Sequence, residues 1–270
     1  MPQKIALCFL VSRNIVNLNV WREWWAGQKE KINMYAHFSN KKGITQAELC
    51  ENRVRAVRTQ WGDISLVKAE YELYNEAYRD KNNKFFILLS ETCVPIRKFS
   101  VVYNRLMKDR KRGMASYRSI GRYDEDLTPF RAKCSDLMDQ YQFFDRTCYA
   151  CDQWKALSRS NVTDFFKMWE DEQYVELFSK YCLHVVPDNL APDELMFINY
   201  LRLKKGKLSD VLRNRVVTYV DFKGKAIHPI AYRQLTSQLS DDLCTTDSLF
   251  ARKFANPLEK RLLAQLPLTC

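Results

Sequence analysis

Two neighbouring acids, Asp193 and Glu194, stand at the start of an apolar helical run in the stretch APDELMFINYLRL. Pro192 just before them suits the first turn of a helix, and the helix dipole favours negative charge in that turn. The same dipole is expected to keep a carboxylate ionised at neutral pH, as a general base requires. Two interpretations therefore stand side by side: acids that only complete a helix start, or one carboxylate that accepts a proton in catalysis.

The cysteines and glycines do not form a recognisable metal site or phosphate-binding loop. The nine cysteines include one C-x-x-C pair, Cys148 and Cys151, with no second pair or histidine at zinc-finger spacing. We expect scattered, reduced thiols, and the odd count argues against a fully disulfide-bonded secreted protein. The seven glycines form neither a G-x-G-x-x-G nor a G-K-[ST] loop, so neither common phosphate-binding loop is expected.

The composition is that of a soluble globular protein. The chain has 270 residues, 46% hydrophobic and 28% charged, enough for one large α/β domain or two small ones. Its formal charge of +11 favours an anionic partner such as nucleic acid, an acidic glycan, a phosphate or a membrane surface. No zinc-finger spacing, RNA-recognition strand or long basic tail accompanies the charge, so a dedicated nucleic-acid module is not favoured.

The elements that must position the acids alternate along the chain. Buried strands are predicted at 4–12, 32–39 and 84–91, and helices at 16–27, 63–81 and 99–111. This order predicts a parallel sheet with right-handed crossovers. Ligands of such sheets bind beyond the carboxyl ends of the strands, which are followed here by the loops after Ser12, His37 and Leu89.

The second half is predicted to extend this sheet with an antiparallel edge. A strand enters a polar loop within 113–130, two helices fill 152–181, and RNRVVTYVDF at 213–222 is predicted as one strand. The last segment, with LFARKF at 249–254, is predicted as a basic turn and a short helix. The predicted fold class is thus α/β, a mostly parallel twisted sheet flanked by helices.

Six blocks in a fixed order carry a family resemblance. The first block, at 61–107, contains the patterns W-G-x-I-S-x-V-x-A-E and F-x-L-L-S-E-x-C-x-P. The five later blocks are GRY (121–123), QW (153–154), PDE (192–194), TYVD with HP (218–229) and LFARKF. In this pattern the chain resembles the core-2/I-branching β-1,6-N-acetylglucosaminyltransferases, especially their plant-like branch. The resemblance spans roughly residues 4 to 265. It implies a GT-A-type fold and an inverting, metal-independent transfer from a nucleotide-sugar to a glycan hydroxyl.

Such a transfer needs a base for the acceptor hydroxyl and positive charge for the departing nucleoside diphosphate. Glu194 matches the family's catalytic glutamate in the PDE block, which leaves Asp193 to cap or orient the turn. Lys253 matches the lysine that contacts the diphosphate, and Arg252 could share this task. The family's second basic residue has three candidates here: Arg233, Lys225 and Arg215.

The resemblance also implies donor and acceptor contacts. Uridine is expected at the first two strand ends, near Val11, Ser12, Arg13 and His37. His37 also fits a buried strand residue, and Ser39 stands where animal members carry an aspartate. The acceptor and the sugar are expected near Glu91, Arg122, Gln153, Trp154 and Asp193. Trp154 fits either a sugar-stacking ring or a core residue.

No metal or other cofactor is expected. Many GT-A enzymes hold Mg²⁺ or Mn²⁺ with a D-x-D after the third strand, where this chain has Ser90, Glu91 and Thr92, with a single acid. The D-x-D formed by Asp124 and Asp126 follows a polar loop and leaves a metal-dependent transferase as an alternative. Another alternative is a non-catalytic glycan- or nucleic-acid-binding protein of the same fold, against which Glu194 and LFARKF argue.

The resemblance predicts a single GT-A-type domain over 1–270, with a nucleotide-binding half at 1–110 and an acceptor-binding, catalytic half at 111–270. Related enzymes transfer N-acetylglucosamine, xylose or glucuronic acid, so the expected partners are a UDP-sugar and a glycan or glycoside acceptor, without nucleic acid. The short apolar run at 5–11 fits a strand rather than a signal or a membrane span. A soluble cytoplasmic protein of viral or microbial setting is expected, or a Golgi-lumenal one if an anchor precedes the chain.

Overall fold

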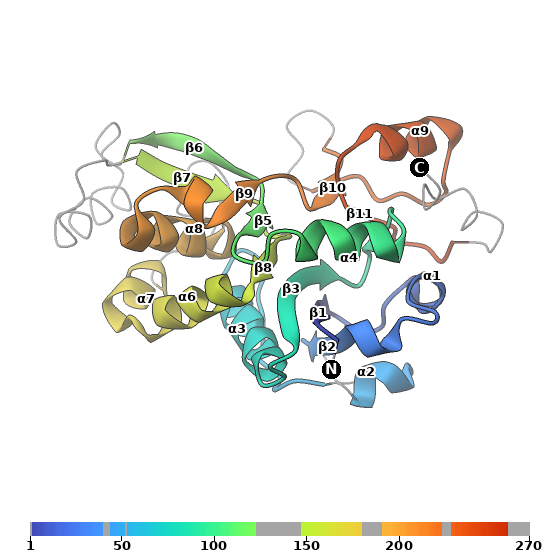
Figure 1. Cartoon of the computed structure of the whole chain (residues 1–270), viewed down its shortest axis with the longest axis horizontal. Helices are drawn as coiled ribbons and strands as arrows, with labels where there is room; N and C mark the ends of the chain where they lie inside the picture. Colours follow the sequence, from blue (N-terminus) through green and yellow to red (C-terminus); the bar gives the residue numbers. More distant parts are fainter. Residues whose placement is uncertain are drawn as a thin grey trace.

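The computed structural model describes residues 2–39, 44–51, 53–122, 147–179, 191–222 and 228–258. It is an α/β structure whose central sheet has six strands in the order β2-β1-β3-β8-β5-β9 (Figure 1). The three predicted N-terminal strands are confirmed as β1 (Lys4–Val11), β2 (Ile32–Phe38) and β3 (Asn83–Ser90). Both neighbours of β1 run parallel to it. Their carboxyl ends therefore lie at one edge of the sheet.

The other half of the sheet contains an antiparallel strand, but this strand lies inside the sheet and not at its edge as predicted. β8 (Ala156–Ser158) runs antiparallel to β3 and to β5 (Gly113–Ala115), whereas β9 (Leu212–Asn214) runs parallel to β5. Gly113 occupies a crowded position in β5, because a Cβ atom there would come within 2.4 Å of Asn161 Oδ1. A side chain at this position would thus push β5 away from the helix that follows β8.

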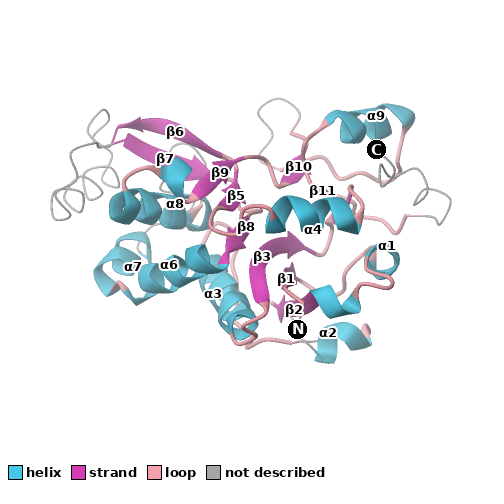
Figure 2. Cartoon of the chain, viewed as in Figure 1, coloured by secondary structure: helices cyan, strands magenta, loops and turns pink. Residues whose placement is uncertain are grey.

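Helices cover both faces of the sheet, as Figure 2 shows. Alternating strand residues face opposite layers: Ala6 and Cys8 pack with the apolar sides of α3 (Ser65–Tyr78), α6 (Arg159–Glu170) and α8 (Pro192–Lys205). Ile5, Leu7 and Phe9 pack instead against α1 (Leu18–Trp24) and α4 (Phe99–Met107). The strands are apolar on both sides because both faces are covered.

The described residues also form further helices. They are η1 (Lys29–Lys31), α2 (Ala47–Glu51), α7 (Glu172–Ser179), η3 (Leu208–Asp210) and α9 (Ser237–Thr245). β6 (Tyr117–Arg122) and β7 (Thr147–Cys151) form an antiparallel pair that packs on α8. α6 and α7 confirm the two helices predicted within 152–181, but the start of that range is not helical, because Ala156–Ser158 form β8.

A second sheet corrects two predictions. The segment RNRVVTYVDF is not one strand, since β9 ends at Asn214 and β10 (Thr218–Val220) belongs to a different sheet. LFARKF is not only a turn: β11 (Phe250–Arg252) runs between β10 and β4 (Val94–Pro95). The strands of this sheet are short, and the sheet is stabilised by packing, because Phe250 and Ala251 are fully buried.

Two further expectations concern thiols and membranes. Cys8, Cys93 and Cys151 are buried free thiols, but Cys244 is disulfide-bonded, so the expectation of reduced thiols is wrong at that position. Within the described ranges, none of the helices combines the length and the apolar character that a membrane span requires.

Candidate active site

The first turn of α8 holds Glu194. Pro192 occupies the first helical position as predicted, but the N-cap is Ala191, which has no side-chain oxygen to accept from the helix. The Glu194 carboxylate itself turns back, and its Oε2 accepts from the Ala191 N–H at 3.3 Å. The side chain is thus held at the helix start by a bond that a lone surface acid would lack.

Burial rather than the helix dipole sets the protonation of Glu194. Loss of solvent and, to a smaller extent, the neighbouring Asp193 raise the pKa of Glu194 to about 7, although the Ala191 N–H and Lys155 oppose the rise. The prediction of a carboxylate kept fully ionised at neutral pH is therefore wrong, because desolvation outweighs the dipole. A group that titrates near pH 7 is nevertheless well suited to accept a proton.

Asp193 points into the interior. It is 5% exposed, and burial raises the pKa of its carboxyl group. Across the part of the chain that the structure describes, no group forms a hydrogen bond with its Oδ1. Lys155 and a backbone N–H of the turn both oppose the rise of its pKa.

A second group of polar residues gathers where β1 and β3 end. Ser12 Oγ donates to Glu91 Oε1 at 3.0 Å, and the Val16 N–H donates to the Glu91 carbonyl at 2.9 Å. Ser12 follows β1 and Glu91 follows β3, so the parallel order of these strands brings them together. This is the edge at which an open α/β sheet binds its ligands.

Arg252 lies over the ring of Trp154. The guanidinium carbon is 4.3 Å from the ring centroid, and Trp154 is 7% exposed. Burial lowers the pKa of Arg252, while Cys93 and Glu91 oppose that shift. Trp154 is therefore a packed residue that supports a cation rather than an open stacking surface, which decides between the two predicted roles.

Backbone bonds hold the LFARKF segment at the end of β3. The Phe254 N–H donates to the Thr92 carbonyl at 3.0 Å, and the Lys253 carbonyl accepts from the Tyr232 N–H at 2.8 Å. Asn17, fully buried, accepts from the Leu258 N–H at 2.8 Å and donates to the carbonyls of Phe254 and Asn256. Lys253 is thereby fixed next to Thr92, one residue beyond Glu91.

Residues 153–155 connect these cations with Glu194. Trp154 supports Arg252, while the next residue, Lys155, extends its ammonium to 3.2 Å from the Gln153 carbonyl and 3.5 Å from the Asp193 carbonyl. The structure thus links the QW, PDE and LFARKF blocks, which lie far apart in the sequence. Glu194 and Arg252 are thus joined through residues 153–155, and Lys253 follows Arg252 in the chain.

Two residues of this cluster were not predicted as site residues. Lys155 and Glu70 form an ion pair of 3.0 Å in which each side chain is 1% exposed. The signal was available, since Glu70 is a charge on the apolar face of a helix, three residues after Val67 and three before Leu73. Lys155 likewise interrupts the apolar stretch between Trp154 and Ala156.

The WG and HP blocks also meet. The rings of Trp61 and His228 have centroids 5.2 Å apart, although 55% of Trp61 is exposed. Trp61 lies just before α3 in the chain. His228 lies two residues before Ile230, whose N–H donates to the Asp221 carbonyl. The contact joins the two halves of the chain at the protein surface.

These contacts agree with a comparison against known protein families. The model of the Core-2/I-Branching enzyme family matches residues 5–245. The chain belongs to the core-2/I-branching enzyme family. It is also 24% identical to a rice protein named Glycosyltransferase BC10 (Oryza sativa subsp. japonica), over 97% of this chain and 77% of the rice protein. This core-2/I-branching enzyme is accordingly a glycosyltransferase, and its α/β structure fits the predicted GT-A-type fold.

The predicted uridine contacts of this core-2/I-branching enzyme are only partly accessible. Val11 is 3% exposed and His37 is 1% exposed, and His37 Nε2 accepts from the Val57 N–H at 2.8 Å. Burial lowers the pKa of His37 to about 4, so the ring is neutral at pH 7. These contacts favour the buried-strand role for His37. Ser12, Arg13 and Ser39 remain exposed at the strand ends.

The other predicted residues are not joined to the cluster by a described contact. Arg233 is exposed, and Arg215 forms an ion pair with Asp247 at 2.5 Å. Arg122 is the last residue of β6. Asp124, Asp126 and Lys225 lie outside the described residues. In the described ranges no three acidic, histidine or cysteine residues form a group that could hold a metal ion.

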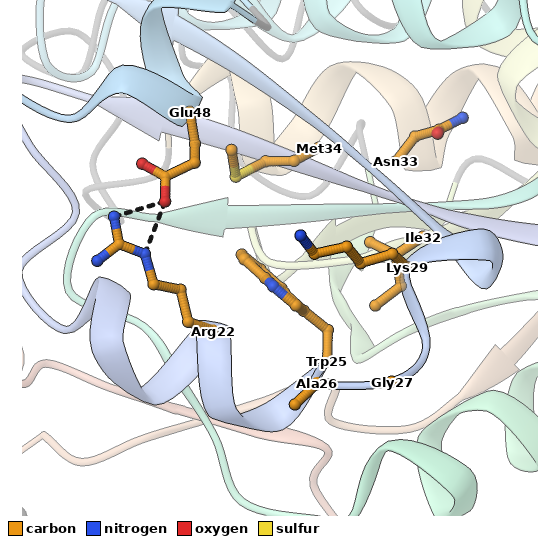
Figure 3. Close-up of a pocket in the computed structure, with 9 residues that line it drawn as sticks. All are labelled: Arg22, Trp25, Ala26, Gly27, Lys29, Ile32, Asn33, Met34 and Glu48. Atoms are coloured by element: carbon orange, nitrogen blue, oxygen red, sulfur yellow. Dashed lines mark hydrogen bonds and ion pairs between the residues drawn. The ribbon is translucent and has the colours of Figure 1, made fainter.

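A pocket of about 680 Å³ lies elsewhere, beside the edge strand β2 (Figure 3). Trp25, Ile32 and Met34 line it, and the Arg22 side chain donates to Glu48 at 2.6 Å across one side. Its strand residues come from the amino end of β2, whereas the Ser12–Glu91 contact lies at the carboxyl ends. The pocket is therefore separate from the candidate active site of this core-2/I-branching enzyme.

Proposed function

We propose that this core-2/I-branching enzyme transfers a sugar from a UDP-sugar to a glycan hydroxyl with inversion at the anomeric carbon and without a metal ion. The observation that carries the proposal is the cluster in which Glu194, whose pKa is about 7, is connected through Lys155 and Trp154 with the cation Arg252, which Lys253 follows in the chain. Each part of that cluster meets one requirement of the reaction.

Glu194 acts as the general base in this proposal. Its carboxylate accepts the proton of the acceptor hydroxyl while the hydroxyl oxygen bonds to the anomeric carbon of the donor. The bond from that carbon to the phosphate oxygen breaks as the new bond forms, so one displacement inverts the configuration. The pKa of about 7 supports this role, because the group exchanges protons near neutral pH.

Arg252 and Lys253 stabilise the departing UDP. The leaving diphosphate gains negative charge as the bond breaks, and neighbouring cations lower the energy of that state. Trp154 holds the Arg252 guanidinium from one side, so the position of this cation is fixed before the donor binds. Arg233 is the exposed candidate for a further diphosphate contact.

The strand ends divide into donor and acceptor positions. Ser12 and Arg13 lie beyond β1, where the nucleotide is proposed to bind together with the backbone of Val11 and the exposed Ser39. The acceptor is proposed to lie between Glu91 and Gln153, near the carboxylate of Glu194. N-acetylglucosamine, xylose and glucuronic acid remain the donor sugars to be compared.

Two cations in place of two carboxylates support metal independence. β3 ends at Ser90 and is followed by Glu91 and Thr92, and the Glu91 carboxylate already accepts from Ser12. A hard divalent ion prefers several oxygen ligands with negative charge. The cations therefore take the part that a metal would otherwise have at the diphosphate.

The test is UDP release from a panel of the three UDP-sugars, each with a glycan acceptor mixture and with EDTA present. We expect the wild type to retain its rate in EDTA and Glu194→Gln to lose roughly 10²–10⁴ of kcat, the range typical for removal of a general base. Glu172→Gln, at the start of α7, is the matched control because Glu172 is an exposed acid in a first helical turn. Full activity of Glu194→Gln would disprove the base, and loss in EDTA restored by Mn²⁺ would favour Asp124 and Asp126.

A further inference from the structure

Glu70 and Lys155 form a buried ion pair that the proposed chemistry does not use directly. The carboxylate and the ammonium are 3.0 Å apart, and each side chain is 1% exposed. Glu70 lies in the second turn of α3, and Lys155 directly precedes β8. Because desolvation offsets much of the attraction, a buried pair of this kind is weak evidence for stability alone.

The Lys155 ammonium joins three segments of the chain. It contacts Glu70 on α3, the Gln153 carbonyl at 3.2 Å, and the Asp193 carbonyl at 3.5 Å in the first turn of α8. Asp193 directly precedes Glu194, and Gln153 directly precedes Trp154, on which Arg252 rests. One buried cation therefore lies between the proposed base and the support of the proposed diphosphate clamp.

Several charged or titratable groups surround the Glu194 carboxylate. Asp193 comes from the same helix, Cys151 from the end of β7, and Asp152 and Lys155 from the connection between β7 and β8. Behind them lie Glu70 and Tyr74 of α3, and Arg118 of β6 faces Asp152. Among these groups Lys155 is the cation that acts on Glu194 itself, while Asp193 and Asp152 are acidic.

We propose that Glu70 and Lys155 are positioning residues that fix the first turn of α8 and set the electrostatic environment of the Glu194 carboxylate. The Lys155 ammonium favours the ionised form of Glu194, and Glu70 keeps that ammonium protonated and limits its effect. Burial would lower the pKa of Lys155, but Glu70, Cys151 and Asp193 hold it above its ordinary value. The inference rests on the proposed function, in which Glu194 is the base.

Opposite charges in the pair predict opposite effects of their removal. Lys155→Met removes the cation, so the pKa of Glu194 should rise by about 1 pH unit. Glu70→Gln leaves the ammonium without its partner, so the pKa of Glu194 should fall. The double variant Glu70→Gln/Lys155→Met removes both charges and should return the pKa toward that of the wild type. A pair that served packing alone would not reverse the sign.

The experiment measures the Glu194 carboxyl directly and the reaction separately. Carbon-13 NMR of protein labelled at the glutamate carboxyl carbon, with Glu194→Gln to assign the signal, gives the pKa without any substrate. The pH profile of kcat/KM for UDP release is recorded on the same proteins. Glu76→Gln is the matched control, since Glu76 pairs with Arg79 on the same helix but both side chains are exposed.

The outcomes separate this inference from the proposed function. Shifts in opposite directions for Glu70→Gln and Lys155→Met support the inference, and shifts in one direction or none overturn it. If the carboxyl signal shifts as expected but the acid limb of kcat/KM does not follow, the pair acts on Glu194 and Glu194 is not the base. Should Lys155→Met fail to fold, Glu70→Gln still decides, because a rise of the Glu194 pKa in that variant would overturn the inference.

Discussion

At the scale of single residues, the cluster depends on how far each charge is withdrawn from water. Glu194 titrates near 7 because burial and Asp193 outweigh the Ala191 N–H. Arg252 stays in place because an aromatic ring, rather than a carboxylate, supports it. A cation held by a ring keeps its charge available to an anionic ligand, whereas a cation in an ion pair is already neutralised.

The support of Arg252 by Trp154 predicts that lysine cannot replace arginine. Arg252→Lys keeps the charge but loses the planar group that lies on the ring, so we expect kcat/KM for the donor to fall by about 10-fold. Isothermal titration with UDP should show weaker binding in the same variant. Arg79→Lys, at an exposed arginine directly after α3, is the control. Unchanged UDP affinity in Arg252→Lys would show that the guanidinium does not contact the diphosphate.

Glu194, Arg252 and Lys253 could be predicted as site residues from the sequence. The burial and the neighbouring charges that shift the pKa values of Glu194 and Arg252 could not be predicted in this way. The dipole argument for Glu194 used only its neighbours in the helix, whereas the decisive desolvation comes from the surrounding fold. The partner of Lys155 lies 85 residues away, and no local pattern connects Glu70 with it. Such pairs become visible only once the fold brings α3 to the residue that precedes β8.

At the scale of elements, length and periodicity decided which predictions held. β1, β3 and α3 have eight, eight and fourteen residues, and each was predicted because a long pattern averages out local exceptions. β10 and β11 have three residues each, too few for a period. They become strands because Phe250 and Ala251 pack in the core and pair with Thr218 and Tyr219.

Asn17 fixes the segment that carries Lys253, which gives a prediction at this scale. Asn17→Ala removes one acceptor and two donor contacts from a fully buried position, so we expect a loss of about 2–3 kcal/mol in the free energy of unfolding. UDP should also bind more weakly, because the chain around Lys253 loses its anchor. Chemical denaturation and UDP titration measure the two effects. Gln238→Ala on α9, which removes an exposed bond to Asp242, should change neither.

At the scale of the whole molecule, groups with shifted pKa values oppose one another. Glu194 has a pKa of about 7, above the ordinary 4.5, and burial also raises the pKa of Glu70, although Lys155 opposes that rise. Each group therefore contributes stability that is complete below pH 4.5 and is lost as pH rises through its pKa in the folded protein. His37 has the reverse sign: its pKa falls from 6.5 to about 4, so its contribution is present above pH 6.5 and is lost as pH falls through 4.

The two buried carboxyl groups should outweigh the single histidine. We therefore expect the melting temperature to be higher at pH 5.5 than at pH 8, whereas a reaction that needs ionised Glu194 should be faster at pH 8.

Glu194→Gln removes the buried carboxylate that forms as the pH rises. The variant should therefore have a higher free energy of unfolding than the wild type, by about 1–3 kcal/mol at pH 8 but by much less at pH 4.5. Thermal melts of both proteins across this range measure the difference. Equal effects at both pH values would mean that Glu194 is not protonated preferentially in the folded state. A base that is costly to ionise in the fold thus links the pH range of activity to a loss of stability.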